Sequence, residues 1–343
     1  MSGAIHSKID DLVEVSARLG RNLLLVQAGS GNTSVKVDGT LWIKASGKWL
    51  AHAGREEILV PVSLWEERVP SRRPEHRPGL TPSIETAMHV VVPHAATIHV
   101  HSVNTIVWAV QEDGPELLAE LLDGLPWQWI PYVASGVPLA NEAAKAFARA
   151  PATAILVLAN HGLVVCGPDP FAAEALLTEV ERRLAIEPRW APKPNRALLE
   201  RIAEGTEWRL PEIESIHALS TDAISRTILM DGILYPCQAI FLGPATPVLP
   251  LSLTPADAAR RYEKEHGVRP LFFLVDGHGV LVRQSMNAAE REMLVGLTEI
   301  VQRIDVSANL RYLSEGEVSS VLNADTYRYR GLVEQGELAR AAS

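Results

Sequence analysis

The amino-acid sequence predicts an α/β protein of two domains. Helix-like stripes of apolar residues alternate along the chain with short strand-like runs, which indicates mixed α/β structure. The chain has 343 residues, more than one ordinary domain needs, and leaves room for a large core. A strand–turn–strand–helix pattern also occurs twice, once on each side of a proline-rich segment.

The composition excludes several classes of function. Apolar residues make up 47% of the chain and charged residues 21%, the proportions of an ordinary globular protein. A formal charge of −9 argues against non-specific nucleic-acid binding, and an anionic ligand would need a locally basic pocket. Cys166 and Cys237 lie far apart, so neither a disulfide framework nor a cysteine zinc site is expected. Without a signal-peptide pattern or a long apolar run, we expect a cytoplasmic protein with no membrane function.

The first elements follow from the hydrophobic pattern. Residues 6–19 carry a helical apolar stripe that ends at Gly20. Three strand-like runs follow, at residues 23–26, 33–37 and 41–44. Asp38-Gly39 separates the last two runs and predicts a tight hairpin.

The next elements surround a proline-rich loop at residues 70–82. Three arginines of this loop are either solvated or contact a substrate carboxylate or phosphate: Arg72, Arg73 and Arg77. A helix is expected over residues 83–92 because Pro93 would end it. Alternation predicts a strand at 97–103, and the apolar run at 154–159 predicts a buried strand.

The two domains are predicted to be related to each other. Residues 187–196 contain three prolines and are the best candidate for a linker. The segment 154–167 resembles 271–284, and each is followed by a helix-like segment that begins Ala-Ala-Glu. The two His-Gly pairs are 117 residues apart and the two Ala-Ala-Glu segments 116, and these nearly equal offsets favour a repeated unit over a chance similarity between short apolar strands.

Three histidines are candidate metal ligands. In a strand, His99 and His101 would project from the same face while Ile98 and Val100 face the core, although such a pair can also be merely exposed. His161 follows a buried strand, and we expect Gly162 to adopt a positive dihedral that lifts the imidazole clear. A turn histidine bonded to backbone is the alternative for His161.

A carboxylate and two small polar loops complete the candidate site. Glu85 lies in the first turn of a predicted helix, where the helix dipole alone would also favour it. Three histidines with an open position and a nearby carboxylate are typical of a catalytic metal site. The loop 29–34 could bind an anion through its small polar residues, and Lys44 with Ser46-Gly47 could add a cation and a second turn. Plain turns are the alternative interpretation of both loops.

Four motifs stand in a characteristic order and spacing. They are Gly-Asn-Thr-Ser at 31–34, Ser46-Gly47, Pro82-Ser83-Ile84-Glu85 leading to His99-x-His101, and Asn160-His161-Gly162. In these motifs the chain resembles the class II (metal-dependent) aldolase/adducin family, of the fuculose- and rhamnulose-phosphate aldolase type in its long two-domain form. The resemblance implies an αβα sandwich around a mainly antiparallel sheet. It also implies a homo-oligomer, tetramer or dimer, with a divalent ion, most often zinc, with manganese, cobalt or iron as alternatives.

The resemblance also implies a role for each matching residue. The metal ligands would be His99, His101 and His161, with Glu85 as the catalytic carboxylate. Residues lining the substrate or phosphate pocket would be Gly31, Asn32, Thr33, Ser46, Gly47 and Ser83. The implied activity is a lyase that cleaves a small polyhydroxylated ketose or keto acid by a retro-aldol reaction through a metal-stabilised enediolate. Ile84 replaces a serine common in sugar-phosphate aldolases, which leaves phosphorylation of the substrate open.

Other activities remain open on the same fold. An epimerase, a dehydratase and a decarboxylase can all use this metal chemistry, and an adducin-like scaffold would use none. We expect a metal domain over residues 1–187, a linker over 188–197 and a degenerate copy of the domain over 198–343. The copy is expected to lack a metal site because His278 has no H-x-H companion.

Overall fold

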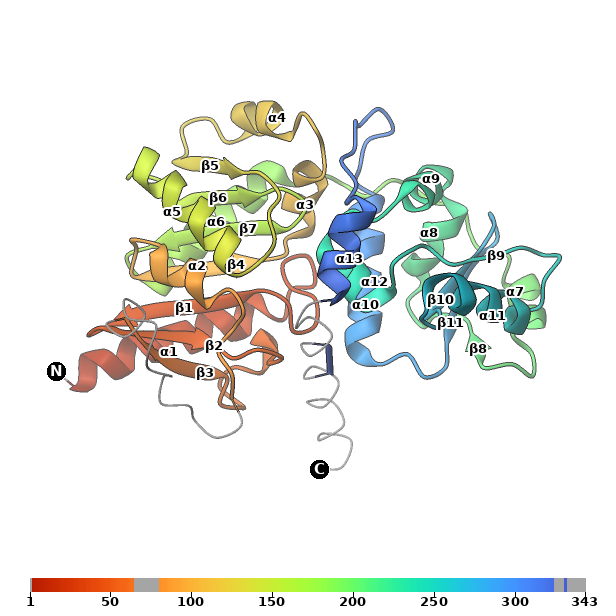
Figure 1. Ribbon diagram of the computed structural model, residues 1–343, viewed down its shortest axis with the longest axis horizontal. Coiled ribbons are helices and arrows are strands. Elements are labelled where there is room, and N and C mark those ends of the chain that lie inside the picture. The colour runs from red at the N-terminus through yellow and green to blue at the C-terminus, as the bar shows by residue number, and fades with distance from the viewer. Residues whose placement is uncertain (1, 65–79, 324–329, 332–343) are drawn as a thin grey trace. The chain divides into compact units, whose positions relative to one another are not determined.

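The computed structural model describes residues 2–64, 80–323 and 330–331, which form two compact units (Figure 1). The first unit runs to Ala109 and resumes from Asp113 to Ala185. The second unit comprises Val110–Glu112 and the described residues from Ile186 to Gly331. The three loop arginines at 72, 73 and 77 lie outside the described residues. Among the helices of the described ranges, none combines the length and the apolar character needed to cross a membrane.

The first unit is built on a seven-stranded sheet. Its strands are β1 (Asn32–Val37), β2 (Thr40–Lys44), β3 (Leu59–Ser63), β4 (Ala96–Val100), β5 (Trp127–Ile130), β6 (Ile155–Leu158) and β7 (Gly162–Gly167). Their order is β3-β2-β1-β4-β7-β6-β5, and all neighbours are antiparallel except β5 and β6. The expected mainly antiparallel sheet is therefore confirmed.

Helices cover both faces of this sheet. One face carries Ile98 and Val100 and packs against α1 (Ser2–Leu19) and α6 (Pro170–Leu184). The opposite face carries Leu156 and Val164 and packs against α2 (Thr86–Val91) and α5 (Val137–Arg149). The remaining helices of the unit are η1 (Leu50–His52), α3 (Val103–Ala109) and α4 (Gly114–Leu121). Two apolar layers on either side of one sheet make the αβα sandwich that the resemblance implies.

The hairpin prediction is confirmed, and one strand prediction is wrong. Asp38 and Gly39 have φ of 48° and 76° and join β1 to β2, as a two-residue hairpin turn requires. The apolar run at 23–26 forms turns instead of a strand. The side chain of Asn22 accepts a hydrogen bond from Leu24 N, and its carbonyl oxygen accepts from Leu25 N and Val26 N. This local turn satisfies the backbone, so the apolar side chains enter the core without a strand.

The second unit contains a four-stranded sheet of its own. Its strands are β8 (Trp208–Arg209), β9 (Val248–Leu249), β10 (Phe272–Val275) and β11 (Gly279–Arg283), in the order β8-β11-β10-β9. Its helices are α7 (Arg196–Ala203), η2 (Glu214–His217), α8 (Ala218–Thr221), α9 (Ala223–Asp231), α10 (Pro236–Leu242), α11 (Pro255–His266), α12 (Ala288–Val301) and α13 (Glu315–Asn323). The chain is thus an α/β protein with a second α/β domain.

We propose that the second unit is a degenerate copy of part of the first. The order β8-β11-β10-β9 repeats β4-β7-β6-β5, with the same sequence of antiparallel, antiparallel and parallel pairs. The turns between β6 and β7 and between β10 and β11 each end in a histidine, His161 and His278. A helix follows in both cases, N-capped by the side chain of Asp169 in α6 and of Asn287 in α12. Shared topology and register support the repeat proposed from sequence.

Candidate metal centre

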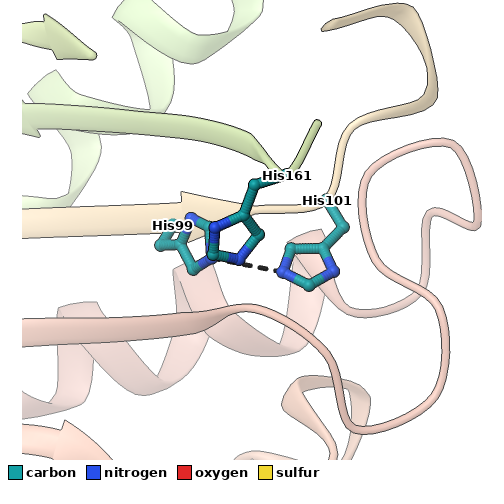
Figure 2. A group of neighbouring side chains, drawn as sticks. All are labelled: His99, His101 and His161. Atoms are coloured by element: carbon teal, nitrogen blue, oxygen red, sulfur yellow. Dashed lines mark hydrogen bonds between the residues drawn. The ribbon is translucent and has the colours of Figure 1, made fainter. Parts of the chain in front are cut away.

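Three buried histidines meet at one end of the first sheet (Figure 2). His99 lies in β4, His101 lies one residue beyond the end of that strand, and His161 lies in the turn between β6 and β7. Because β4 pairs with β7, this turn is brought alongside the His99-x-His101 segment. The ring centroids are 4.9 to 5.0 Å apart, and one ligand nitrogen of each ring lies within 4.8 Å of the others.

The geometry of the three histidines fits a divalent metal ion. Nε2 of His99 and Nε2 of His101 are 3.2 Å apart. Two nitrogens that share one tetrahedral zinc at ordinary bond lengths are about 3.3 Å apart. Nδ1 of His99 lies 3.0 Å from the carbonyl oxygen of Leu163, which can only accept a hydrogen bond. Nδ1 therefore carries the proton, and the lone pair of Nε2 is directed at the shared point.

The protonation state of His99 and His101 also suits metal binding. Burial, with a smaller effect of the His161 charge, lowers the pKa of His99 to about 4. Burial, followed by the charges of His161 and His99, holds the pKa of His101 well below its usual value. Both imidazoles are therefore neutral near pH 7. Their lone pairs are then available to a metal without displacing a proton.

Glu85 places a carboxylate against the same three rings. It is the N-cap residue of α2 and is 5% exposed, with Oε2 3.2 Å from Nε2 of His99 and Oε1 3.3 Å from Nε2 of His161. Burial opposes ionisation of this carboxyl, but the neighbouring histidines hold its pKa well below the usual range. The ionised carboxylate can therefore approach a metal ion or accept a proton from a bound ligand.

Two predicted pocket residues hold Glu85 in place. Nδ2 of Asn32 donates to Oε2 of Glu85 at 2.7 Å and to Oγ of Ser83 at 3.2 Å. The hydroxyl of Ser83 also accepts from the backbone N–H of Glu85 at 3.3 Å. Within the described residues, Oδ1 of Asn32 is buried and accepts no hydrogen bond. Asn32 therefore orients the carboxylate and keeps one acceptor for a ligand.

Gly31 brings its loop directly against the backbone of His99. Its φ is +62°, and a Cβ atom there would lie 2.7 Å from the carbonyl oxygen of His99. A side chain at this position would push Asn32 and the histidine strand apart. The glycine is therefore required for the site to close.

Gly31→Ala should lower the free energy of unfolding by more than about 2 kcal/mol, because the clash adds to the left-handed strain. The matched control is Gly124→Ala, since Gly124 has φ +77° and no other part of the described chain lies within 4 Å of where a Cβ would stand. Urea unfolding followed by circular dichroism measures both variants. Equal losses in the two would show that close approach to His99 costs nothing.

Of the remaining predicted pocket residues, Ser46 and Gly47 adjoin the segment that leads to Ser83, whereas the hydroxyl of Thr33 does not reach the histidines. Ser46 and Gly47 are the central residues of a turn from Ala45 to Lys48, with Gly47 at φ +75°. The N–H of Ser46 donates to Thr81 O at 2.7 Å, so the turn adjoins the segment that leads to Ser83. The structure does not bring the hydroxyl of Thr33 to the histidines, because it bonds with Ser16 Oγ of α1 at 2.6 Å.

The structure corrects one expectation about the turn that carries His161. The positive dihedral expected at Gly162 is found at Asn160, with φ 51°. Gly162 is needed instead for close packing, because a Cβ there would lie 2.4 Å from the carbonyl oxygen of Val100.

Sequence reasoning missed Ser135, whose hydroxyl donates weakly to Oε1 of Glu85 at 3.4 Å. No motif marks Ser135, which reaches the site from the loop after β5.

His89 lies one turn beyond Glu85, and we expect it to make the folded state sensitive to acid. It is fully buried, and its Nδ1 lies 2.7 Å from Oγ of Ser34. Burial, with a smaller effect of His99, lowers the pKa of His89 to about 3. The unfolded chain protonates this group near pH 6.5, so stability present above pH 6.5 is lost as the pH falls toward 3.

His89→Gln should reduce this acid sensitivity, because glutamine can bond Ser34 without titrating. Between pH 7 and pH 5 the variant should lose about 2 kcal/mol less unfolding free energy than the wild type. Urea unfolding of both proteins in a metal chelator at the two pH values measures the difference. Parallel losses in the two proteins would contradict the buried neutral histidine.

Comparisons with known proteins identify the family of the first unit. Residues 10–187 match the family model for the class II aldolase and adducin N-terminal domain. An uncharacterized oxidoreductase, YuxG of Bacillus subtilis (strain 168), is 26% identical over 188 residues. That match covers 46% of this chain, but the chain spans only about a quarter, 26%, of that relative's length.

Several solved structures are similar to half of the chain. The class II aldolase domain of a Thermoplasma acidophilum protein is 22% identical, with a TM-score of 0.45, over 51% of this chain and 91% of that one. YgbL of Klebsiella pneumoniae, provisionally described as an aldolase, epimerase or decarboxylase, is 24% identical, with a TM-score of 0.39, over 52% and 87%. The L-fuculose-1-phosphate aldolase of Thermus thermophilus is 22% identical, with a TM-score of 0.37, over 51% and 92%. The family model matches more than half of the residues, and the chain belongs to the class II aldolase and adducin family.

Proposed function

We propose that the protein is a metal-dependent lyase that performs aldol or retro-aldol chemistry on a small polyhydroxylated ketose or keto acid. The observation that carries this proposal is the ionised Glu85 carboxylate held 3.2 to 3.3 Å from two of three converging histidines. A binding or scaffolding protein has no need to bury a carboxylate and three histidines together. Buried ionisable groups in such an arrangement are typical of a catalytic site.

Each residue of the site would have a distinct role in this reaction. His99, His101 and His161 would hold a divalent ion such as zinc, and Asn32 and Ser83 would orient Glu85 through the bonds described above. The bound ion would supply a Lewis acid that stabilises negative charge on a substrate oxygen. Glu85 would accept the proton that leaves the substrate and return it after the carbon–carbon bond has formed or broken. Gly31, Ser46 and Gly47 would shape the pocket for the substrate's polar end.

We also propose that the active form is a homo-oligomer. Two large apolar side chains beside the site are exposed in the single chain, Ile84 at 50% and Val137 at 64%. A Cβ on Gly136 would lie 3.9 Å from Cγ1 of Ile84, so the two segments adjoin. Covering this surface with a second copy would remove apolar area from water. Light scattering of the purified protein tests the oligomeric state.

A substrate screen tests the proposed reaction. The purified protein, stripped with a chelator and then reloaded with zinc, is incubated with ketose 1-phosphates and, separately, with phosphorylated 3-keto acids. Release of an aldehyde from the ketose, lost on stripping and restored by zinc, is the expected result. Carbon dioxide release from the keto acid without aldehyde release would replace the lyase by a decarboxylase. A metal-free protein that folds normally and turns over nothing would favour a scaffold.

A further inference from the structure

His101 lies just outside the strand that carries the other histidine of its pair. The ladder between β4 and β7 ends with Val100 opposite Leu163, one residue before His101 (Figure 2). His99 lies within this ladder, and its ring is also bonded to the carbonyl oxygen of Leu163. The position of His101 therefore depends on the segment that follows it as well as on the strand that precedes it.

The residue after His101 begins helix α3. Ser102 is fully buried, and its hydroxyl accepts a hydrogen bond from the N–H of Thr105 at 3.1 Å, as an N-cap residue does. The N–H of Val103 donates to the carbonyl oxygen of Leu24 at 2.7 Å. The backbone directly beyond His101 is thus tied to its own helix and to the turn after α1.

A carboxylate from helix α6 holds the same segment from the side. Oγ of Ser102 donates to Oε1 of Glu181, and Nδ2 of Asn104 donates to Oε2 of Glu181 at 2.9 Å. A serine hydroxyl can rotate, so accepting its proton fixes the direction in which it points. One carboxylate therefore fastens two side chains of the segment that begins directly after His101.

Helix α6 gives this carboxylate a rigid support. The helix is N-capped by the side chain of Asp169, and its residues Leu177, Val180 and Leu184 lie in the core that also contains Val100. Glu181 follows Val180 directly, so close packing on one side of the helix restricts its movement relative to β4. The carboxylate is therefore a fixed point for the segment that carries Ser102.

The second unit, the proposed copy, has an apolar residue at the equivalent position. The segments 172–174 and 288–290, both Ala-Ala-Glu, align helix α6 with helix α12. This alignment sets Glu290 against Glu174 and Leu297 against Glu181. Leu297 is buried in the core of its own unit. The helix can therefore form with an apolar side chain at this position, and the carboxylate occurs in the unit that has the three histidines.

We propose that Glu181 is a positioning residue of the metal centre, which holds Ser102 and through it the backbone that directs the His101 imidazole at the metal ion. The inference rests on the proposed function, because it assumes that the three histidines bind a metal. Hydrogen bonds that orient the ligands of a metal typically account for about 10- to 100-fold of its affinity. Glu181 acts through Ser102, so its role is to set geometry and not to take part in the reaction.

Three variants separate the geometry of Glu181 from its charge. Glu181→Ala removes both hydrogen bonds, and Glu181→Asp keeps the charge on a side chain that is one methylene too short. Glu181→Gln keeps the length, because its carbonyl can accept from Ser102 while its amide donates to a turned-over Asn104 side chain. The matched control is Glu174→Ala, two turns earlier on α6. Glu174 accepts from Arg18 at 2.7 and 2.6 Å and ties α6 to α1, away from the ligands.

Zinc and cobalt serve as separate probes of the centre. Zinc affinity is measured by competition with a chelator, and the visible absorption of the cobalt-loaded chain reports the coordination geometry. Glu181→Ala and Glu181→Asp should bind zinc about 10- to 100-fold more weakly than the wild type and change the intensity of the cobalt bands. Glu181→Gln and Glu174→Ala should keep the wild-type spectrum and a zinc affinity within about twofold. Circular dichroism establishes folding, and Glu181→Asp carries the test if Glu181→Ala does not fold.

The outcomes distinguish this inference from the proposed function. If Glu174→Ala weakens zinc as much as Glu181→Ala does, Glu181 only stabilises α6 and the positioning role is wrong. The role is also wrong if Glu181→Ala and Glu181→Asp keep the wild-type zinc affinity and cobalt spectrum. If Glu181→Gln fails while Glu181→Asp does not, charge matters and the hydrogen-bond geometry does not. If the wild type binds neither metal, the metal centre itself is overturned, and the role of Glu181 with it.

Discussion

His161→Ala should remove the metal from the protein, whereas His278→Ala should leave it in place. The three ligand nitrogens lie within 4.8 Å of one another, so loss of His161 leaves two ligands where a catalytic zinc site needs three. Elemental analysis of protein purified without chelator should give about one zinc per chain for the wild type and a small fraction of that for His161→Ala. The residues around the remaining pair would stay buried, so the variant should still fold.

His278 is a matched control because it occupies the same place in the second sheet. It ends the turn between β10 and β11, as His161 ends the turn between β6 and β7. Val282 of β11 pairs with Arg209, and extending this register puts Leu210 and Glu212 where His99 and His101 stand in the first unit. His278 therefore lacks two imidazole partners. Equal zinc loss from both variants, or full zinc in His161→Ala, would contradict the assigned site.

The convergence of the three histidines could be predicted because each has a local signature. His99 and His101 stand two residues apart beside alternating core residues, and His161 follows an apolar strand before a glycine. The strand expected over 97–103 ends at Val100, so His101 reaches the centre from the segment after β4 rather than by strand alternation. Local pattern thus predicted that these three histidines converge, for a partly wrong geometric reason.

The hydrogen bonds that hold Glu85 could not be predicted, because they depend on pairing between distant segments. Asn32 meets Glu85 only because β1 pairs with β4 in the register that sets Asn32 opposite His99. Ser135 meets Glu85 only because β5 adds to the sheet parallel to β6. No local spacing encodes these strand pairings, so these contacts could be identified only in the folded structure. For the same reason the sequence wrongly placed the Thr33 hydroxyl in the pocket: it bonds to Ser16 on the opposite face of the sheet.

Glu85→Gln should slow proton transfer greatly while leaving the metal bound. Glutamine has the same size and can still accept the hydrogen bond from Asn32, but it cannot take a proton at neutral pH. A positioned general base contributes about 10²- to 10⁴-fold to the rate, and a loss of this size is expected. The assay is deuterium exchange from D₂O into a phosphorylated hydroxy-ketone, dihydroxyacetone phosphate, followed by NMR. Exchange requires only the proton-transfer step, so the assay tests Glu85 independently of carbon–carbon bond cleavage or formation.

The control for this variant is Glu290→Gln, which alters an equally buried carboxylate in the second unit. Glu290 is 3% exposed and caps α12 with Asn287, so its replacement should cost stability without slowing exchange. Because the pKa of Glu85 is held well below its usual value, the exchange rate of the wild type should not fall between pH 8 and pH 6 through protonation of this group. If the Glu85→Gln variant binds zinc and exchanges deuterium at the wild-type rate, Glu85 is not the proton acceptor. The proton would then have to leave to another group, and Ser135, bonded to the same carboxylate, is the next residue to replace.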